Sequence, residues 1–302
     1  MLFSRVQPLC TPRFRCLELC YQYDPKDLIS YHADNQDVQR LVYYKRYTEA
    51  VKIAERMIGK FPKLYPGYYN IANIAYAQNN FREAADYLRK AIPLKPDNLT
   101  MLKMMAMSLV QIEKVDESMD YFNKALQMDP NSADTHQNFA IALIRKGDLQ
   151  QAVLHFEKCL QLEPNSPDMY FNLGKLYSQQ GDFEKAVKYW KRCLEFKPVP
   201  PQVLNNLAWV MATEQSVKNP DEALRFALRA CELTGFEHPS FLDTLAVAYA
   251  ATGKFDKAIE TAQKALNIAY AANQPQMAND IQKRITLYKN KQSYTEPAKN
   301  EK

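Results

Sequence analysis

The sequence predicts an all-α fold, a right-handed superhelical solenoid of antiparallel helix pairs. Three features of the 302 residues predict it: a regular period, two apolar stripes in each period, and a turn between the stripes. Five prolines set the period and lie 34 residues apart, at Pro62, Pro96, Pro130, Pro164 and Pro198. A small column and a bulky column keep the same step: Ala72, Ala106, Ala140 and Gly174, and Leu88, Phe122, Phe156 and Trp190. A fixed period of about 20–50 residues is typical of a repeat array.

Each period predicts a pair of helices. Within residues 167–200, apolar and small residues recur three and four positions apart, at Tyr170, Leu173, Gly174 and Tyr177 and at Ala186, Trp190 and Cys193. Such spacing places each set on one face of a helix. Gly181-Asp182 lies between the two sets and predicts a turn followed by a helix start. Pro198 cannot continue a helix, so it predicts the end of the second one.

The period divides the chain into seven expected repeats, at 31–64, 65–98, 99–132, 133–166, 167–200, 201–238 and 239–272. The first repeat is degenerate, because Asp37 and Val38 stand where the other repeats have a Leu and a small residue. The sixth carries about four extra residues around Thr213–Pro220. In the last repeat Tyr270 replaces the closing proline.

The segments outside the repeats are expected to be a leader, a cap and a tail. Residues 1–30 predict an irregular leader or the cut end of a longer protein, with an organellar transit segment as the alternative. Residues 273–289 predict a capping helix, because a terminal repeat leaves an apolar face uncovered. That helix is expected to carry Met277, Ile281, Ile285 and Leu287 on one side and Asp280, Lys283 and Arg284 elsewhere. The polar residues 290–302 are expected to be disordered.

The residues of the 167–200 period resemble the tetratricopeptide repeat. A small residue follows a Leu, a Tyr comes three positions later, and Ala, a large aromatic residue, Cys and Pro complete the signature. The resemblance covers residues 31–272 and implies a superhelix whose first helices line a concave, protein-binding groove. Three segments, LNNLAWVMAT, CELTG and LDTLAVAYAATGKFDKAIE, are similar to the C-terminal repeats of large bacterial arrays of this family. Several of those arrays are attached to membranes or to glycosyltransferase modules.

Composition and motifs argue against chemistry and against nucleic acid. A net charge of +5 is weak for this length, whereas a nucleic-acid protein concentrates a basic face. The sequence has no P-loop, dinucleotide fingerprint or G-x-S-x-G motif, and its four histidines lack metal-site spacing. Cys159 and Cys193 take small packing positions, while Cys10, Cys16 and Cys20 have no C-x-x-C spacing. We therefore expect no enzyme, no cofactor and no metal site.

One polar column follows the predicted first helices. The residue before the Leu of each repeat is expected to face the inner surface, and this column reads Asn70, Met104, Asn138, Asn172, Asn206 and Thr244. An asparagine amide offers an acceptor and two donors, so it can pair with a peptide C=O and N–H together. The column resembles the asparagine ladder in the repeats of O-linked N-acetylglucosamine transferase, which implies that its asparagines grip an extended polypeptide. The alternative is that they cap or bridge neighbouring helices.

Six further residues are expected to face the groove, beside Gln137 and Asn205: Tyr69, Asn73, Lys103, Phe171, Lys175 and Trp209. Aromatic residues give contact area at low entropy cost, and packing between repeats is the alternative for each of them. The two lysines with Asn73 are similar to the clamp that some tetratricopeptide proteins use on a C-terminal carboxylate, although their spacing fits it poorly.

These features favour a scaffold that binds an extended peptide or partner protein in the groove. The alternative is the substrate-recruiting arm of a larger membrane-attached or glycosyltransferase assembly. We expect other proteins or peptides as partners, no nucleic acid, no direct membrane span, and self-association through the terminal repeats as an option. Free thiols in the core indicate a reducing, cytoplasmic compartment.

Overall fold

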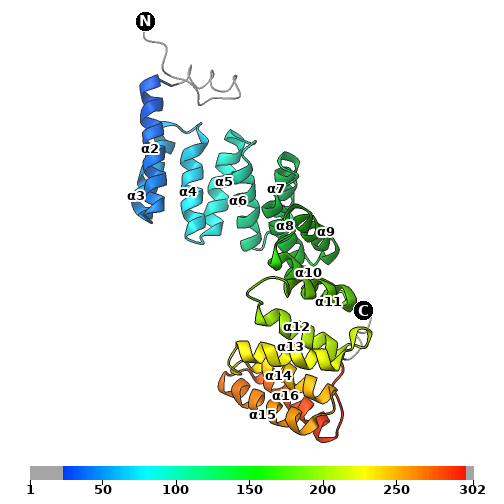
Figure 1. Cartoon of the computed structure of the whole chain (residues 1–302). Coiled ribbons are helices and arrows are strands. Elements are labelled where there is room, and N and C mark those ends of the chain that lie inside the picture. Colours follow the sequence, from blue (N-terminus) through cyan, green and yellow to red (C-terminus); the bar gives the residue numbers. More distant parts are fainter. Residues whose placement is uncertain (1–22, 297–302) are drawn as a thin grey trace. The chain divides into compact units, whose positions relative to one another are not determined.

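The structure is a computed structural model that describes residues 23–296 (Figure 1). This part of the chain contains fifteen α-helices, two short 3-10 turns and no strand, which confirms the all-α fold. The chain divides into two compact units, unit 1 (Met1–Gly147) and unit 2 (Asp148–Lys302). The expected leader and tail therefore fall partly outside the described residues.

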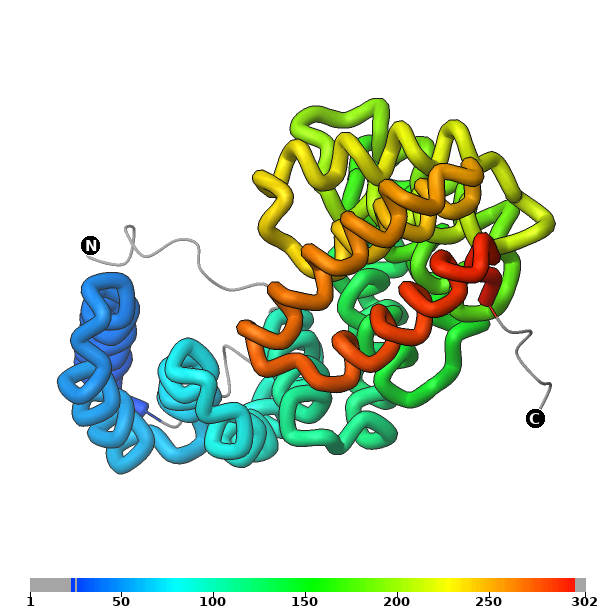
Figure 2. Tube along the Cα trace, turned by 90° about the horizontal axis from the view of Figure 1, so that it is seen from below, coloured from blue at the N-terminus to red at the C-terminus, as the bar shows by residue number. Residues whose placement is uncertain are grey.

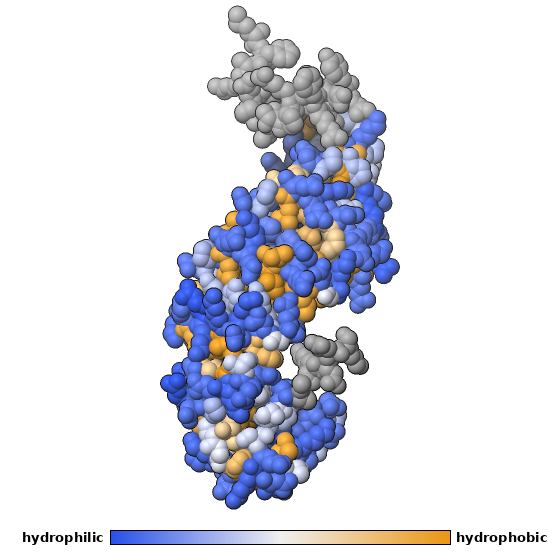
Figure 3. Space-filling view, turned by 90° about the vertical axis from the view of Figure 1, so that its right-hand side faces the viewer, coloured by the Kyte–Doolittle hydropathy of each residue, from blue (hydrophilic) through white to orange (hydrophobic). Residues whose placement is uncertain are grey.

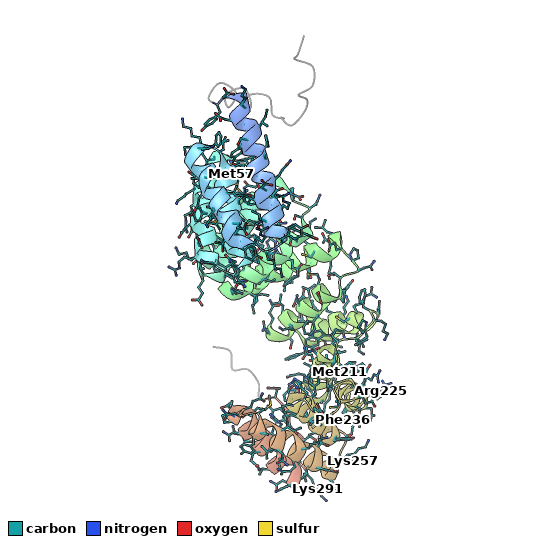
Figure 4. All side chains as sticks on the ribbon, turned by 90° about the vertical axis from the view of Figure 1, so that its left-hand side faces the viewer. Met57, Met211, Arg225, Phe236, Lys257 and Lys291 are labelled. Atoms are coloured by element: carbon teal, nitrogen blue, oxygen red, sulfur yellow. The ribbon has the colours of Figure 1, made fainter. Side chains whose placement is uncertain are left out.

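The described part of unit 1 contains seven helices, which pack against one another in sequence order. They are α2 (Pro25–Tyr43), α3 (Tyr47–Lys60), α4 (Tyr65–Ala77), α5 (Phe81–Ala91), α6 (Leu99–Gln111), α7 (Val115–Met128) and α8 (Ala133–Lys146), with the 3-10 turn η1 (Ile92–Leu94). One apolar cluster joins α4, α5 and α6 through Ala72, Leu88 and Met105, which are all fully buried. Met57 of α3 is also fully buried, in a second cluster at the N-terminal end (Figure 4).

Unit 2 contains the remaining eight helices. They are α9 (Leu149–Leu162), α10 (Pro167–Gln179), α11 (Phe183–Cys193), α12 (Pro201–Thr213), α13 (Pro220–Leu233), α14 (Pro239–Ala251), α15 (Phe255–Ala271) and α16 (Pro275–Lys289). The extra residues expected in the sixth repeat form the 3-10 turn η2 (Gln215–Val217). The last two helices run antiparallel and in contact (Figure 2).

The predicted turn between the two helices of a repeat is present at Gly181-Asp182. Gly181 has φ +83°, a left-handed conformation that glycine adopts without steric cost. The Asp182 carboxylate accepts a hydrogen bond from the backbone N–H of Lys185 at 3.1 Å and so caps the start of α11. In unit 1 Asn79 takes the left-handed position at the corresponding turn, with φ +60°. Asparagine is one of the few other residues that tolerate it.

The small and bulky columns meet inside the helix pairs. In unit 2, Gly174 of α10 lies against the indole of Trp190 of α11. The indole N–H donates to the carbonyl of Phe171 at 3.2 Å, and Trp190 is only 2 % exposed. Hydrophilic side chains cover most of the face in Figure 3, with apolar side chains visible between them.

The first helix begins earlier than the sequence analysis expected. We expected residues 1–30 to be irregular, but α2 starts at Pro25. The Asp24 carboxylate accepts a hydrogen bond from the N–H of Lys26 at 2.8 Å, and a proline occupies the first turn, which is a favourable helix start. Residues 1–22 lie outside the described part of the chain.

The C-terminal cap also differs from expectation. On α16 the buried residues are Ala278, Ile281, Arg284, Ile285 and Tyr288, so Arg284 lies inside and Leu287 is only half-buried. Of the expected tail, the structure describes the residues up to Glu296, which form no helix. Ser293 donates a hydrogen bond to the carbonyl of Ala250, and Trp209 of α12 contacts Tyr294 and Glu296.

Candidate peptide-binding surface

The first helices of neighbouring repeats lie beside each other within each unit. In unit 1, α2 contacts α4 and α6 contacts α8; in unit 2, α12 contacts α14, which contacts α16. All ten residues predicted to bind a peptide are on α4, α6, α8, α10 or α12. We call the side of these helices that carries the ten residues the first-helix surface.

Asn70 is buried between two first helices. It is only 4 % exposed, and its amide donates to Asn35 Oδ1 of α2 at 2.8 Å. Its side chain bridges two neighbouring helices, which favours the alternative interpretation for this residue.

Lys103 and Asn138 lie together but are both engaged by Asp134 of α8. The Lys103 ammonium forms an ion pair with Asp134 Oδ2, and the Asn138 amide donates to Asp134 Oδ1 at 2.9 Å. Burial, and next to it the Asp134 charge, raise the pKa of Tyr76 on α4. The ion pair connects α6 to α8 on the first-helix surface of unit 1. The contacts with Asp134 leave Asn138 half-exposed, with one of its amide donors in use.

The other two predicted residues of unit 1 have different surroundings. Tyr69 packs against the apolar cluster of α4, α5 and α6, and burial raises the pKa of its hydroxyl. This position is therefore one of packing, as the alternative interpretation held. Asn73 is half-buried.

Three of the predicted residues line one pocket in unit 2. They are Lys175 of α10 and Asn206 and Trp209 of α12, and the pocket has a volume of about 240 Å³. The remaining lining residues are Ser178, Gln179, Trp190, Asn205 and Val210. We call this the α10–α12 pocket.

Asn205 places an unpaired hydrogen-bond acceptor in the lining of the α10–α12 pocket. Its side-chain Oδ1 is buried and accepts no hydrogen bond from any described residue. A buried acceptor without a donor costs about 1–3 kcal/mol, so a ligand that donates a hydrogen bond here gains affinity. The amides of Asn172 and Asn206 are likewise without a hydrogen-bonded side-chain partner among the described residues, and both are half-buried.

The charges around the pocket are arranged by two cation–aromatic contacts. The Lys175 ammonium lies 5.7 Å from the centre of the Phe171 ring, which places both predicted residues on the same face of α10. The Arg284 guanidinium lies 5.6 Å from the Trp209 ring and pairs with Asp243 of α14 at 2.9 and 2.5 Å. Burial raises the pKa of Asp243, and the Arg284 charge opposes that rise. The ion pair with Asp243 therefore holds the Arg284 guanidinium in place beside the Trp209 ring.

The sequence analysis did not identify Arg284, Ser178 or Gln179 as site residues. Arg284 was assigned to the polar side of the cap, and nothing in the period signals its approach to Trp209. Ser178 and Gln179 come directly after Tyr177, the last residue of the repeat signature on this helix. Their position at the end of the helix was the one sequence signal that could have identified them.

Family comparisons identify the repeats. Tetratricopeptide repeat models match residues 121–153, 143–209 and 240–271. The model of anaphase-promoting complex, cyclosome, subunit 3 matches residues 44–125. No curated protein matches the chain. The predicted tetratricopeptide repeats are therefore confirmed within residues 121–209 and 240–271.

Solved structures show the same fold. YrrB, described as a TPR protein with an unusual peptide-binding site, is 19 % identical with a TM-score of 0.55, covering 63 % of this chain and 96 % of YrrB. PilF of Pseudomonas aeruginosa is 17 % identical with a TM-score of 0.54, covering 68 % of this chain and 92 % of PilF. MamA is 17 % identical with a TM-score of 0.51, covering 52 % of this chain and 92 % of MamA.

Two searches of the described residues concern membranes and metals. Between residues 23 and 296, no helix is both long and apolar enough to cross a bilayer. Over the same span, no three His, Cys, Asp or Glu side chains lie close enough together to hold a metal ion.

Proposed function

We propose that this protein is an interaction scaffold that binds an extended peptide of a partner protein on the first-helix surface of unit 2. The α10–α12 pocket carries the proposal, because it gathers Lys175, Asn206 and Trp209 around the unpaired Oδ1 of Asn205. A peptide backbone N–H is a suitable donor for that oxygen.

The peptide is held through its backbone by two amides one repeat apart. Asn172 and Asn206 occupy the same position of successive repeats, and both side chains are free of hydrogen bonds to other described side chains. Each amide can pair with a backbone C=O and N–H at once, which favours binding with little reading of the peptide sequence. The ladder of our proposal is thus shorter than the sequence suggested, because Asn70 and Asn138 have partners inside the protein.

Charge and aromatic surface add to this backbone grip. Lys175 borders the pocket and supplies a positive charge for an acidic group of the ligand. Trp209 supplies a flat, half-exposed ring on the other side. The peptide-binding site named for YrrB supports the proposal by analogy of fold, and the likeness to the ladder of O-linked N-acetylglucosamine transferase supports it from the sequence alone.

A peptide library tests the proposal. Peptides selected by display on the full chain are titrated against the wild type and the Asn172→Ala/Asn206→Ala variant. Two lost bidentate pairings, at about 0.5–1.5 kcal/mol per hydrogen bond, weaken binding at least tenfold. The free energy of unfolding is expected to change by no more than about 0.5 kcal/mol, because both side chains lie at the surface.

The control is Arg225→Ala, an exposed residue of α13 (Figure 4), a helix that contributes no residue to the pocket lining. It removes a charge of the same sign as Lys175 and is expected to leave the affinity unchanged. Selection that returns no peptide, or peptides that bind the double variant as tightly as the wild type, contradicts the proposal.

A further inference from the structure

Residues 293–296 lie on unit 2 as a short bound peptide would. The Ser293 hydroxyl donates to the Ala250 carbonyl at 2.9 Å, at the end of α14. The Tyr294 ring lies 5.8 Å from the Trp209 ring at an interplanar angle of 52°. The Trp209 indole N–H donates to Glu296 Oε1 at 3.0 Å. These contacts come from residues outside any helix, so a non-helical segment is held by one ring, one N–H and one carbonyl.

Arg284 completes the set of groups that hold the segment. Its guanidinium carbon lies 5.2 Å from the Tyr294 ring and 5.6 Å from the Trp209 ring, so both rings contact the same cation. Cation–aromatic contacts strengthen when the cation is shielded from water, and Arg284 is only 8 % exposed. The bidentate pair with Asp243 fixes the guanidinium in place before any segment arrives.

The segment itself is lightly held. Ser293, Thr295 and Glu296 are exposed and only Tyr294 is half-buried. The described contacts therefore use the aromatic ring and the carboxylate two positions after it, while the residue between them faces solvent. Because so few groups hold the segment, we expect another peptide to be able to replace it.

We propose that Trp209, Arg284 and the Ala250 carbonyl form a recognition site for extended segments in which an aromatic residue is followed two positions later by a carboxylate. Residues 293–296 occupy this site in cis. The inference rests on the proposed function, and it adds the chemistry of the peptide and a way to regulate its binding. Trp209 also lines the α10–α12 pocket, so a partner peptide that uses the same ring surface and indole N–H as Tyr294 and Glu296 must displace the segment.

The short connection makes the segment an effective competitor. Only residues 290–292 separate it from the end of α16 at Lys289. Such short tethers give effective concentrations on the order of millimolar. A peptide that binds from solution sees an affinity reduced by the fraction of chains whose site is already filled.

The test uses a synthetic peptide of residues 290–296, labelled with fluorescein at its N-terminus and amidated at its C-terminus. The amide ensures that Glu296 supplies the only carboxylate of the peptide. Binding is measured by fluorescence anisotropy to the full chain, to its Tyr294→Ala/Glu296→Ala variant, and to Thr295→Ala as the matched control. The peptide is expected to bind the double variant about tenfold more tightly than the wild type, and Thr295→Ala is expected to match the wild type.

A second variant checks the carboxylate contact without removing the ring. Trp209→Phe keeps an aromatic surface but has no N–H to donate to Glu296. In the background of the tail double variant it is expected to weaken peptide binding several-fold, and a Glu→Ala change at position 296 of the peptide then has no further effect. The same Glu→Ala change weakens binding several-fold when Trp209 is present, because it removes the acceptor of the indole N–H.

Three results overturn the inference. They are equal affinity for the wild type and the double variant, a Glu→Ala effect of the peptide that persists in Trp209→Phe, and a concentration-dependent dimer that Tyr294→Ala abolishes. The last result places the segment on a second copy. If library peptides still bind through Asn172 and Asn206 in those cases, the proposed function stands without the inference. If the library selection fails but the tail peptide still binds, the proposed backbone grip by Asn172 and Asn206 is wrong and the site at Trp209 stands.

Discussion

Gly174→Ala is expected to destabilise unit 2, although alanine is the better helix former. A Cβ at Gly174 would lie 2.8 Å from Trp190 Cε2 and closer still to Cδ1 and Nε1 of the same indole. Carbon atoms pack at about 3.5 Å or more, so the buried indole has to move by about 1 Å. That movement also lengthens the 3.2 Å hydrogen bond from the indole N–H to the Phe171 carbonyl.

The size of the effect follows from three contributions. Overpacking a core costs about 1–3 kcal/mol, and the weakened indole hydrogen bond costs about 0.5–1.5 kcal/mol more. Replacing glycine by alanine inside a helix returns about 1 kcal/mol. We therefore expect the free energy of unfolding to fall by about 1–3 kcal/mol. Urea unfolding followed by far-ultraviolet circular dichroism measures it without depending on the displaced tryptophan.

Two matched variants make this prediction sharp. A Cβ at Gly59 of α3 would meet no atom within 4 Å, so Gly59→Ala is expected to stabilise unit 1 by about 0.5–1 kcal/mol. Gly174→Ala combined with Trp190→Phe gives the fifth repeat the Ala and Phe pair that the third repeat has at Ala106 and Phe122. This double variant is expected to recover at least half of the unfolding free energy that Gly174→Ala loses. A Gly174→Ala variant that is as stable as the wild type, or more stable, refutes the close approach.

The other predictions concern a buried charge, a buried amide and a buried thiol. Asp243→Ala leaves the Arg284 guanidinium buried without its partner and is expected to cost about 3–5 kcal/mol in urea unfolding, so a loss below 1 kcal/mol argues against the ion pair. Asn70→Ala leaves the Asn35 acceptor on α2 unpaired and is expected to lower the free energy of unfolding by about 1–2 kcal/mol. Asn172→Ala, at the surface, is expected to change it by no more than about 0.5 kcal/mol, so equal melting temperatures of the two variants contradict the bridging role of Asn70. Burial raises the pKa of Cys193 to about 11, so at pH 8 roughly 0.1 % is thiolate, and iodoacetamide is expected to modify it at least a hundredfold more slowly in the native chain than in urea, as mapped by mass spectrometry.

The repeat period predicts where the helix pairs lie because the prolines and glycines that end and start helices affect only the residues next to them in the sequence. First helices begin at Tyr65, Leu99, Ala133, Pro167, Pro201 and Pro239, the residues at which the expected repeats begin. Each start depends on residues within one turn of it, which the sequence displays directly.

The candidate site was less predictable because side chains of one column have different neighbours. Asn70 and Asn172 occupy the same position of their repeats, but only Asn70 faces an amide, that of Asn35 on the degenerate first helix. The period carries no information about α2, so it could not separate a bridging asparagine from a free one. The same holds for Trp209, whose contacts to Arg284 and Tyr294 come from residues beyond the last repeat.

The positions of the two tryptophans allow the unfolding of unit 2 to be followed separately by fluorescence. Both indoles belong to unit 2, where Trp190 is sealed in the interior and Trp209 lies at the surface. Intrinsic tryptophan emission therefore reports on unit 2 alone, while circular dichroism reports on the helices of both units. If the emission and ellipticity curves separate during denaturation, the two units unfold in different steps. Coincident curves mean that the array loses its structure as one cooperative body.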